Sequence, residues 1–140
     1  MLEAHGNLWT FPANYRCITT NGTIKQNGAC VMGRGCAREA RDKYPGLDRE
    51  LGAKILERGN RLHLFPAYCL ITFPVKHHWQ EKADLDLIQA SGYALRELAE
   101  TLPGKTFVLP RPGCGNGGRT WEEVRLFLLM LPDTVTVITW

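Results

Sequence analysis

Apolar residues in the first part of the chain follow first the spacing of a strand and then the spacing of helices. The segment Tyr15–Thr19 predicts a strand, and Asn21-Gly22 is typical of the turn that ends it. Apolar residues at helical spacing predict a helix over 36–44, which stops at Pro45-Gly46. A second short helix is expected over 47–55 for the same reason.

The middle of the chain predicts a hairpin followed by the longest helix. Arg61–Phe65 alternates between apolar and polar residues, and the apolar segment Tyr68–Phe73 follows closely, so we expect two strands joined through Pro66-Ala67. Over 85–102 the apolar residues fall on one helical stripe, and Pro103-Gly104 stops that helix.

The last part of the chain predicts strand, helix and strand. Thr106–Leu109 has the pattern of a buried strand, and Thr134–Ile138 that of a final one. Thr120 and Glu123 match a capping box that opens a helix through Met130. Helices that alternate with apolar strands predict an α/β fold with three α/β/α layers, which we expect to form one domain over 1–140.

Composition excludes several classes of protein. With 44% hydrophobic and 22% charged residues, the chain is close to the globular average and is not disordered. The longest apolar run, Leu126–Leu131, is too short to span a membrane, which takes about 20 residues. The first six residues have neither the basic nor the apolar region of a signal peptide.

Five cysteines without Cys-x-x-Cys spacing predict free thiols in a reducing compartment, so we expect a cytoplasmic protein. No cysteines or histidines are paired at the usual zinc-ligand spacings, and the adjacent His77 and His78 are poorly placed to chelate from one strand. We therefore expect neither a metal ion nor a cofactor.

The distribution of charge says more than the net charge of +3. No Asp or Glu occurs over 4–38, 58–80 or 101–121, although these segments contain many of the Arg and Lys residues. Two explanations remain open: these segments contain buried strands, which avoid charge, or their loops face an anionic ligand.

Two glycine-rich loops favour the anionic ligand. Residues 27–36 and 109–118 each follow a predicted strand and precede a helix. The second contains Gly-x-Gly-x-x-Gly, but too near the C-terminus for a dinucleotide-binding Rossmann site, and neither has the Gly-Lys-Ser/Thr of a phosphate-binding P-loop. Glycines let backbone N–H groups approach a phosphate, and a helix N-terminus adds partial positive charge. Two such loops predict a clamp for a diphosphate, whereas a single one would indicate only a tight turn.

These loops and a third segment resemble the macrodomain family, the α/β/α module with a mixed central sheet that binds ADP-ribose. The resemblance is strongest to the DarG type, whose members remove ADP-ribose from DNA. It covers nearly the whole chain and is carried by Val31–Ala37, by Phe73–Trp79, and by Gly113–Gly118 with the following Trp121. Of these, Phe-Pro-Val-Lys-His-His-Trp is the most specific.

The resemblance implies an ADP-ribosyl glycohydrolase with Lys76 as the catalytic residue. The partner it implies is ADP-ribose or ADP-ribosylated DNA, with ADP-ribosylated protein as an alternative, and a monomer is expected. It also implies ADP-ribose contacts for Asn7, Leu8, Asn21, Asn27, Val31, Met32, Gly33, Arg34, Gly35, Cys36, Pro74, Gly113, Cys114, Gly115, Asn116, Gly117 and Gly118.

Three features depart from the pattern of the family. The stretch 21–27 is longer than usual, and His77 and Gln80 stand where DarG-type chains tend to have arginine. Gly117 takes the place of an aspartate of related glycohydrolases, as it does in DarG-type loops. The chain ends with its predicted final strand, so the further domain thought to contact the toxin in DarG proteins is expected to be absent.

Two alternatives to the glycohydrolase remain open: a reader that binds ADP-ribose without chemistry, and a phosphatase acting on ADP-ribose 1″-phosphate. The role of Lys76 is also open. A neutral amine can attack C1″ of the distal ribose, whereas a charged one can stabilise the leaving group. Cys36 and Cys114 are expected to line the pocket as small packing residues, because neither has an evident base partner.

Overall fold

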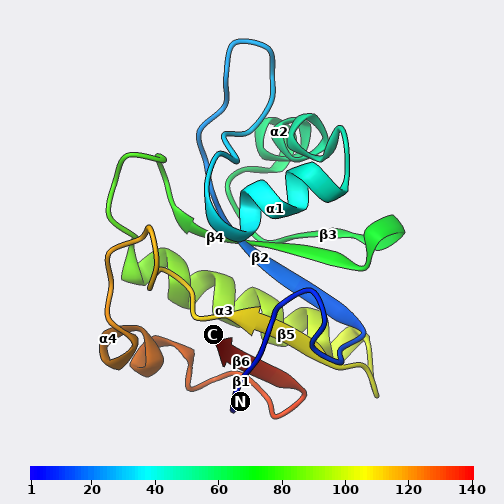
Figure 1. The fold of residues 1–140 in the computed structure, drawn as a ribbon, viewed down its shortest axis with the longest axis vertical. Helices are drawn as coiled ribbons and strands as arrows, with labels where there is room; N and C mark the ends of the chain where they lie inside the picture. The colour runs from blue at the N-terminus through cyan, green and yellow to red at the C-terminus, as the bar shows by residue number, and fades with distance from the viewer.

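The computed structural model describes residues 1–140, and one six-stranded sheet runs through it (Figure 1). Across the sheet the strands follow the order β1-β6-β5-β2-β4-β3. Neighbouring strands are parallel except β3 and β4, so the mixed sheet is confirmed. The strands are β1 (Leu2–His5), β2 (Tyr15–Asn21), β3 (His63–Phe65), β4 (Leu70–Lys76), β5 (Phe107–Pro110) and β6 (Val135–Thr139).

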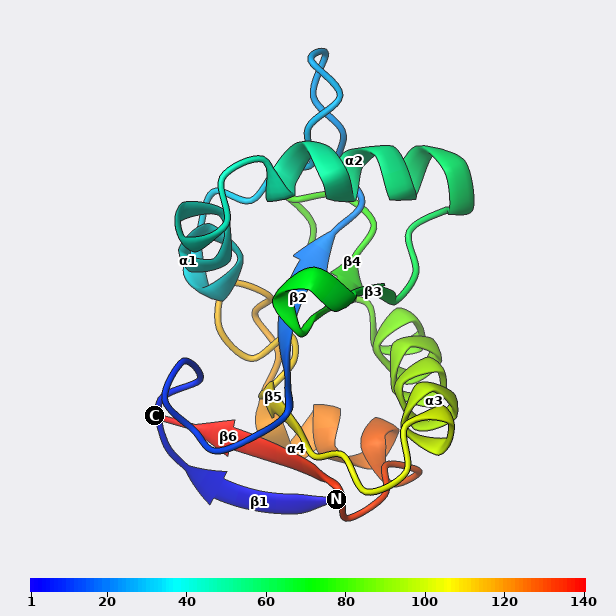
Figure 2. The ribbon, with the colours of Figure 1, turned by 90° about the vertical axis from the view of Figure 1, so that its right-hand side faces the viewer.

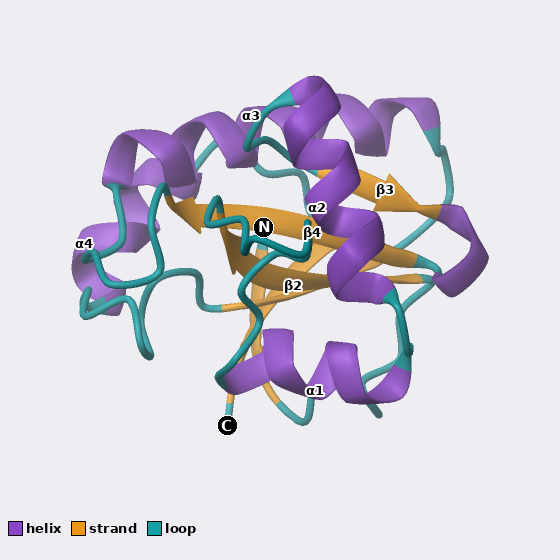
Figure 3. Cartoon of the chain, turned by 90° about the horizontal axis from the view of Figure 1, so that it is seen from above, coloured by secondary structure: helices purple, strands orange, loops and turns teal.

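Four helices cover the two faces of this sheet. They are α1 (Gly35–Lys43), α2 (Leu47–Arg58), α3 (Leu85–Thr101) and α4 (Trp121–Arg125). Figure 2 shows α1 and α3 on opposite sides of β2 and β4, and Figure 3 shows the same separation from above. The chain therefore has the three α/β/α layers that the sequence predicts.

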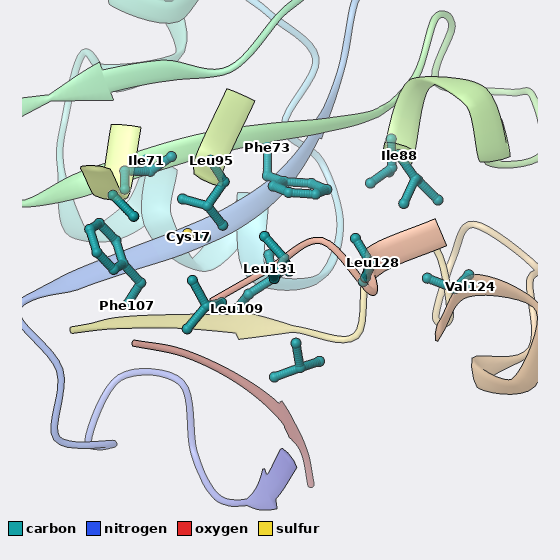
Figure 4. Packing of buried hydrophobic residues seen from close by; sticks show 14 of the residues in the cluster. Cys17, Ile71, Phe73, Ile88, Leu95, Phe107, Leu109, Val124, Leu128 and Leu131 are labelled. Carbon is teal, nitrogen blue, oxygen red and sulfur yellow. The ribbon is translucent and has the colours of Figure 1, made fainter. Parts of the chain in front are cut away.

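Successive residues of the central strands pack into different hydrophobic cores, because side chains alternate between the faces of a strand. Cys17 and Leu109 belong to the core beneath α3 and α4, which is drawn in Figure 4. Their neighbours Ile18 and Val108 belong to the core beneath α1 and α2. This alternation in adjacent strands fixes the sheet between the two helical layers.

The structure adds a strand and shortens a helix relative to the sequence prediction. Strand β1 was not predicted, because it is a short edge strand with mostly exposed side chains, Leu2 among them. It is held by parallel pairing with β6. The predicted helix through Met130 is wrong: α4 ends at Arg125 and a 3-10 turn, Leu126–Leu128, follows.

The predicted hairpin is present, but its connection is longer than Pro66-Ala67. A 3-10 turn over Pro66–Tyr68 joins β3 to β4, and Cys69 then adopts a positive φ of 50° before the strand begins. The strand β4 extends through Lys76, beyond the predicted end at Phe73. This extension carries Lys76 to the edge of the sheet where the glycine-rich loops lie. None of the helices combines the length and the hydropathy that a membrane span requires.

Candidate functional site

A pocket of about 1240 Å³ opens at the carboxyl ends of four adjacent strands. Its floor includes Asn21 from β2, Lys76 from β4, Pro110 from β5 and Thr139 from β6. Ligands of open α/β sheets bind at this edge, because loops from several strands converge there. Both predicted glycine-rich loops contribute to its walls.

The first wall is the segment Val31–Cys36, which leads into α1. The first N–H groups of a helix lack partners within it and attract anions. In α1 no side chain caps these groups, and the first turn holds no acidic residue. Arg34 precedes the helix and adds a positive charge at the pocket. This wall can therefore bind a phosphate through the backbone.

The second wall is the loop Gly113–Gly117, which folds tightly on itself. A Cβ added at Gly117 would lie 2.6 Å from the Cα of Gly113, and Gly113 itself has a φ of +75°. Only glycine fits these two requirements without strain. The glycines of this loop thus bring its backbone close to the pocket.

The N-terminus of α4, the helix after this second loop, is capped by the protein's own side chains. This differs from the expectation that both helix N-termini attract the ligand. Thr120 Oγ1 accepts a hydrogen bond from the N–H of Glu123, and the Glu123 carboxylate accepts one from the N–H of Thr120. The capping box that the sequence predicts is confirmed, and its carboxylate compensates the positive end of α4. Of these two helix N-termini, only that of α1 has neither a capping side chain nor an acidic residue in its first turn.

Lys76 is held at the meeting point of three segments. Its Nζ donates hydrogen bonds to the carbonyl oxygens of Trp79, at 3.2 Å, and of Asn116, at 3.1 Å. Its own carbonyl oxygen accepts from the Gly22 N–H at 3.1 Å and from Asn60 Nδ2 at 2.9 Å. The amine is thus fixed between the end of β4 and the second glycine loop, which lie side by side in Figure 1.

The surroundings of Lys76 favour the neutral amine more than water does. Partial burial lowers the pKa of Lys76, and the positive charge of Arg34 lowers it further. A lysine with a lowered pKa is a better nucleophile near neutral pH, because a larger fraction has a free electron pair.

Asn21 lies opposite Lys76, since the two residues pair at the ends of β2 and β4. Its Nδ2 donates to the carbonyl oxygen of Val31 at 3.0 Å, and its Oδ1 accepts from the Thr23 N–H at 2.9 Å. The side chain therefore ties the first glycine loop to the sheet as well as lining the pocket.

The two pocket thiols lack the features of catalytic cysteines. Burial raises the pKa of Cys36, whose sulfur lies 3.4 Å from both the N–H and the hydroxyl of Thr19. Burial also raises the pKa of Cys114 to about 11. A raised pKa lowers the fraction of reactive thiolate at both residues, which favours their interpretation as packing residues.

The structure brings most of the predicted site residues to this pocket, but four of them do not line it. Asn7 turns its Oδ1 to the Trp9 N–H at 2.8 Å within its own loop, and Asn27 accepts from the Ala29 N–H in an exposed turn. Pro74 is buried in β4, and Gly118 lies just beyond the lining part of its loop. The predicted residues that do line the pocket are Leu8, Asn21, Val31, Met32, Gly33, Arg34, Gly35, Cys36, Lys76, Gly113, Cys114, Gly115, Asn116 and Gly117.

The pocket is also lined by three aromatic residues, which the sequence prediction did not assign to the site. Trp79 belongs to the motif around Lys76, so its position in the sequence could have indicated it. The guanidinium of Arg111 lies over Trp121, 5.0 Å from the centroid of the indole ring. The indole N–H of Trp121 donates to a carboxylate oxygen of Glu3 at 2.8 Å. Trp140 follows β6, and nothing in the sequence pattern points to it. No group of three or more His, Cys, Asp or Glu side chains is placed to hold a metal ion.

Comparison with known proteins relates the chain to one group. It is 30% identical over 122 residues to the DNA ADP-ribosyl glycohydrolase of Mycobacterium bovis and 28% identical over 131 residues to that of Thermus aquaticus. These matches cover 77% and 86% of the chain but only 34% of each relative. The chain thus spans about a third of the length of these curated relatives. No protein-family model matches it.

Solved structures agree with the sequence relatives. The macrodomain of Mycobacterium tuberculosis DarG matches 98% of the chain, and 96% of that structure is covered, with a TM-score of 0.78 and 26% identity. The macrodomain of Thermus aquaticus DarG matches 99% of the chain, with 96% of that structure covered, a TM-score of 0.77 and 26% identity.

The three-layer fold and the glycine-lined pocket at the strand ends are those of a macrodomain, which is the class of this protein. Within this class the chain is a macrodomain of the DarG type, as the sequence and structural relatives together show.

Proposed function

We propose that the chain is an ADP-ribosyl glycohydrolase that binds ADP-ribose in this pocket and releases it from modified DNA. The observation that carries the proposal is the position of Lys76. Its amine is fixed between Trp79 and Asn116 at the edge of the pocket where two loops suited to phosphates meet. The relatives named DNA ADP-ribosyl glycohydrolase support the activity and DNA as the substrate.

The ligand can be placed in outline from the two walls. The diphosphate binds between the N-terminus of α1 and the loop Gly113–Gly117, where backbone N–H groups are accessible. The distal ribose then lies beside Lys76, because the amine is bonded to that same loop through Asn116. A solved structure of Thermosipho africanus DarTG in complex with ADP-ribose has the same fold, at 18% identity and a TM-score of 0.77.

The lowered pKa of Lys76 supports the nucleophilic route. The neutral Nζ forms a bond to C1″, the bond between C1″ and the DNA base breaks, and the base leaves with the electron pair and takes up a proton. The ribosyl amine opens to an imine, and water hydrolyses it. ADP-ribose is released and the free amine of Lys76 is restored.

The test is to incubate the protein with ADP-ribosylated single-stranded DNA, with ADP-ribosylated protein and with ADP-ribose 1″-phosphate, and to measure the products. We expect ADP-ribose release from the DNA. Release from the protein alone would assign a different substrate, and phosphate release alone would indicate the phosphatase. Tight ADP-ribose binding without any product would replace the enzyme with the reader.

A further inference from the structure

We propose that Trp79 recognises the nucleobase that is released, by stacking its indole ring on that base. The inference rests on the proposed function and names the part of the substrate that the pocket reads besides ADP-ribose. Trp79 lines the pocket three residues after Lys76. The residue is 42% exposed, so part of it is open to a ligand.

The backbone of Trp79 is fixed on both sides next to the reacting amine. Its N–H donates to Thr23 Oγ1 at 2.9 Å, and its carbonyl oxygen accepts from Lys76 Nζ at 3.2 Å. The base must lie close to Nζ, because the bond that breaks joins this base to the carbon that Nζ attacks. The position of Trp79 therefore places an aromatic ring within reach of the base.

The ring itself is suited to stacking. It packs against the ring of His78, with centroids 6.1 Å apart and planes inclined by 30°, and much of its surface stays open. An aromatic ring stacks on any nucleobase, because every base has a π-face, and the contact gains affinity without reading sequence.

The other two tryptophans of the pocket are less suited to this contact. Trp121 is covered by Arg111 and donates its indole N–H to Glu3. Trp140 follows β6, which is separated from β4 by β5 and β2. At about 4.8 Å per strand, that places it roughly 14 Å across the sheet from the end of β4. Among the pocket aromatics, Trp79 is the one beside the amine.

The proposal is tested by equilibrium binding in a Lys76→Ala background, where hydrolysis does not consume the ligand. The probes are ADP-ribose, a short single-stranded DNA carrying ADP-ribose on one base, and the same DNA unmodified. We expect the modified DNA to bind about tenfold or more tighter than ADP-ribose. Adding Trp79→Ala should remove that advantage and change the affinity for ADP-ribose by less than about threefold.

Two further variants separate stacking from a structural role. Trp79→Phe keeps an aromatic face and should retain most of the advantage, whereas Tyr93→Ala, an exposed aromatic residue of α3 outside the pocket, should leave all affinities unchanged. In the enzyme with Lys76 intact, Trp79→Ala should lower kcat/KM on modified DNA about tenfold.

The proposal is overturned if modified DNA binds no tighter than ADP-ribose, if plain DNA binds as tightly as modified DNA, or if Trp79→Ala weakens ADP-ribose equally. Since these affinities do not depend on turnover, they stand apart from the proposed function. If the wild-type protein releases no ADP-ribose, the proposed glycohydrolase activity is contradicted. The binding measurements still decide whether Trp79 stacks on the base.

Discussion

Lys76 Nζ and the carbonyl oxygen of Asn116 are 3.1 Å apart, although the two residues are separated by 40 positions in the sequence. A second bond, from the Ala83 N–H to the Gly117 oxygen at 2.9 Å, joins the same two loops. The amine and the loop Gly113–Gly117 are therefore held in one frame. Because the bond between Ala83 and Gly117 does not involve the Lys76 amine, a mutation that removes the amine should leave the two segments joined. Binding and chemistry can therefore be tested separately.

Lys76→Ala should abolish turnover and preserve binding. We expect ADP-ribose release to fall by at least about 10²-fold, because the reacting group is removed. ADP-ribose affinity should change by less than about tenfold, since the phosphate contacts come from α1 and the glycine loops. Single-turnover assays and calorimetry measure the two quantities. Normal turnover of the variant would rule out Lys76 as the catalytic residue.

Gly33 and Gly117 should respond to substitution in opposite ways. A Cβ at Gly33 meets no protein atom within 4 Å and points into open space, so Gly33→Val should fold and block the ligand. Its free energy of unfolding should change by less than about 0.5 kcal/mol. A Cβ at Gly117 lies 2.6 Å from backbone of Gly113, so Gly117→Ala should destabilise the protein by about 1–3 kcal/mol.

Thermal denaturation and ADP-ribose titration distinguish these two effects. Normal ADP-ribose binding by Gly33→Val would mean that the first loop is only a turn. Neither of these two glycines has a positive φ. The positive φ values of the site belong to Gly35, Gly113 and Gly118.

The sequence predicted the layers because each depends on local periodicity and on caps. The strand over Tyr15–Thr19 and the capping box at Thr120 are visible in any window of a few residues, and the structure confirms both. The order of strands was not predictable in this way, since β1 pairs with β6 through backbone groups more than 130 residues apart.

Those parts of the site that belong to a short sequence motif were predictable. The glycine loops and Lys76 come together because parallel strands end at one edge. Side-chain direction was not predictable: Asn7 and Asn27 each accept a hydrogen bond within their own turn and do not line the pocket. These outcomes depend on short-range hydrogen bonds that residue type alone leaves undecided.

Asp84 should make the protein sensitive to acid. A hydrogen bond from His77 at 2.8 Å lowers the pKa of Asp84, and the N–H groups of Asp86 and Leu87 at the start of α3 lower it further. A carboxylate with a lowered pKa contributes stability above its unfolded pKa and loses it as the pH falls through its folded pKa. Asp84→Ala should cost about 1 kcal/mol near neutral pH through loss of the cap.

Urea denaturation at several pH values checks this prediction. Asp84→Asn is the matched control, because asparagine also caps a helix but does not titrate in this range. It should retain part of the stability and weaken the dependence on acid pH. An unchanged acid profile in Asp84→Asn would show that other carboxylates govern it.

Unmodified single-stranded DNA should bind weakly and with a strong dependence on salt. Arg34 and Arg111 line the pocket without a carboxylate partner, but Arg119 is paired with Glu123. A net charge of +3 neutralises few phosphates, and each such contact is weakened by added salt. Fluorescence anisotropy at two salt concentrations measures this. Nanomolar binding of plain DNA at physiological salt would contradict recognition of the modification itself.

The pH profile of turnover distinguishes the two roles of Lys76. If the amine is the nucleophile, kcat/KM should rise with pH through the pKa of Lys76, because the neutral form reacts. Burial and the charge of Arg34 lower that pKa, so the rise should come at lower pH than for an ordinary lysine. Arg34→Gln removes the positive charge that lowers the pKa of Lys76, so the rise of kcat/KM should move to higher pH. Arg34→Lys keeps the charge and should leave the rise at the same pH. Lys76→Arg should be inactive on this route, since a guanidinium stays protonated. A rate that falls as the pH rises, together with an active Lys76→Arg, would assign the charged, stabilising role instead.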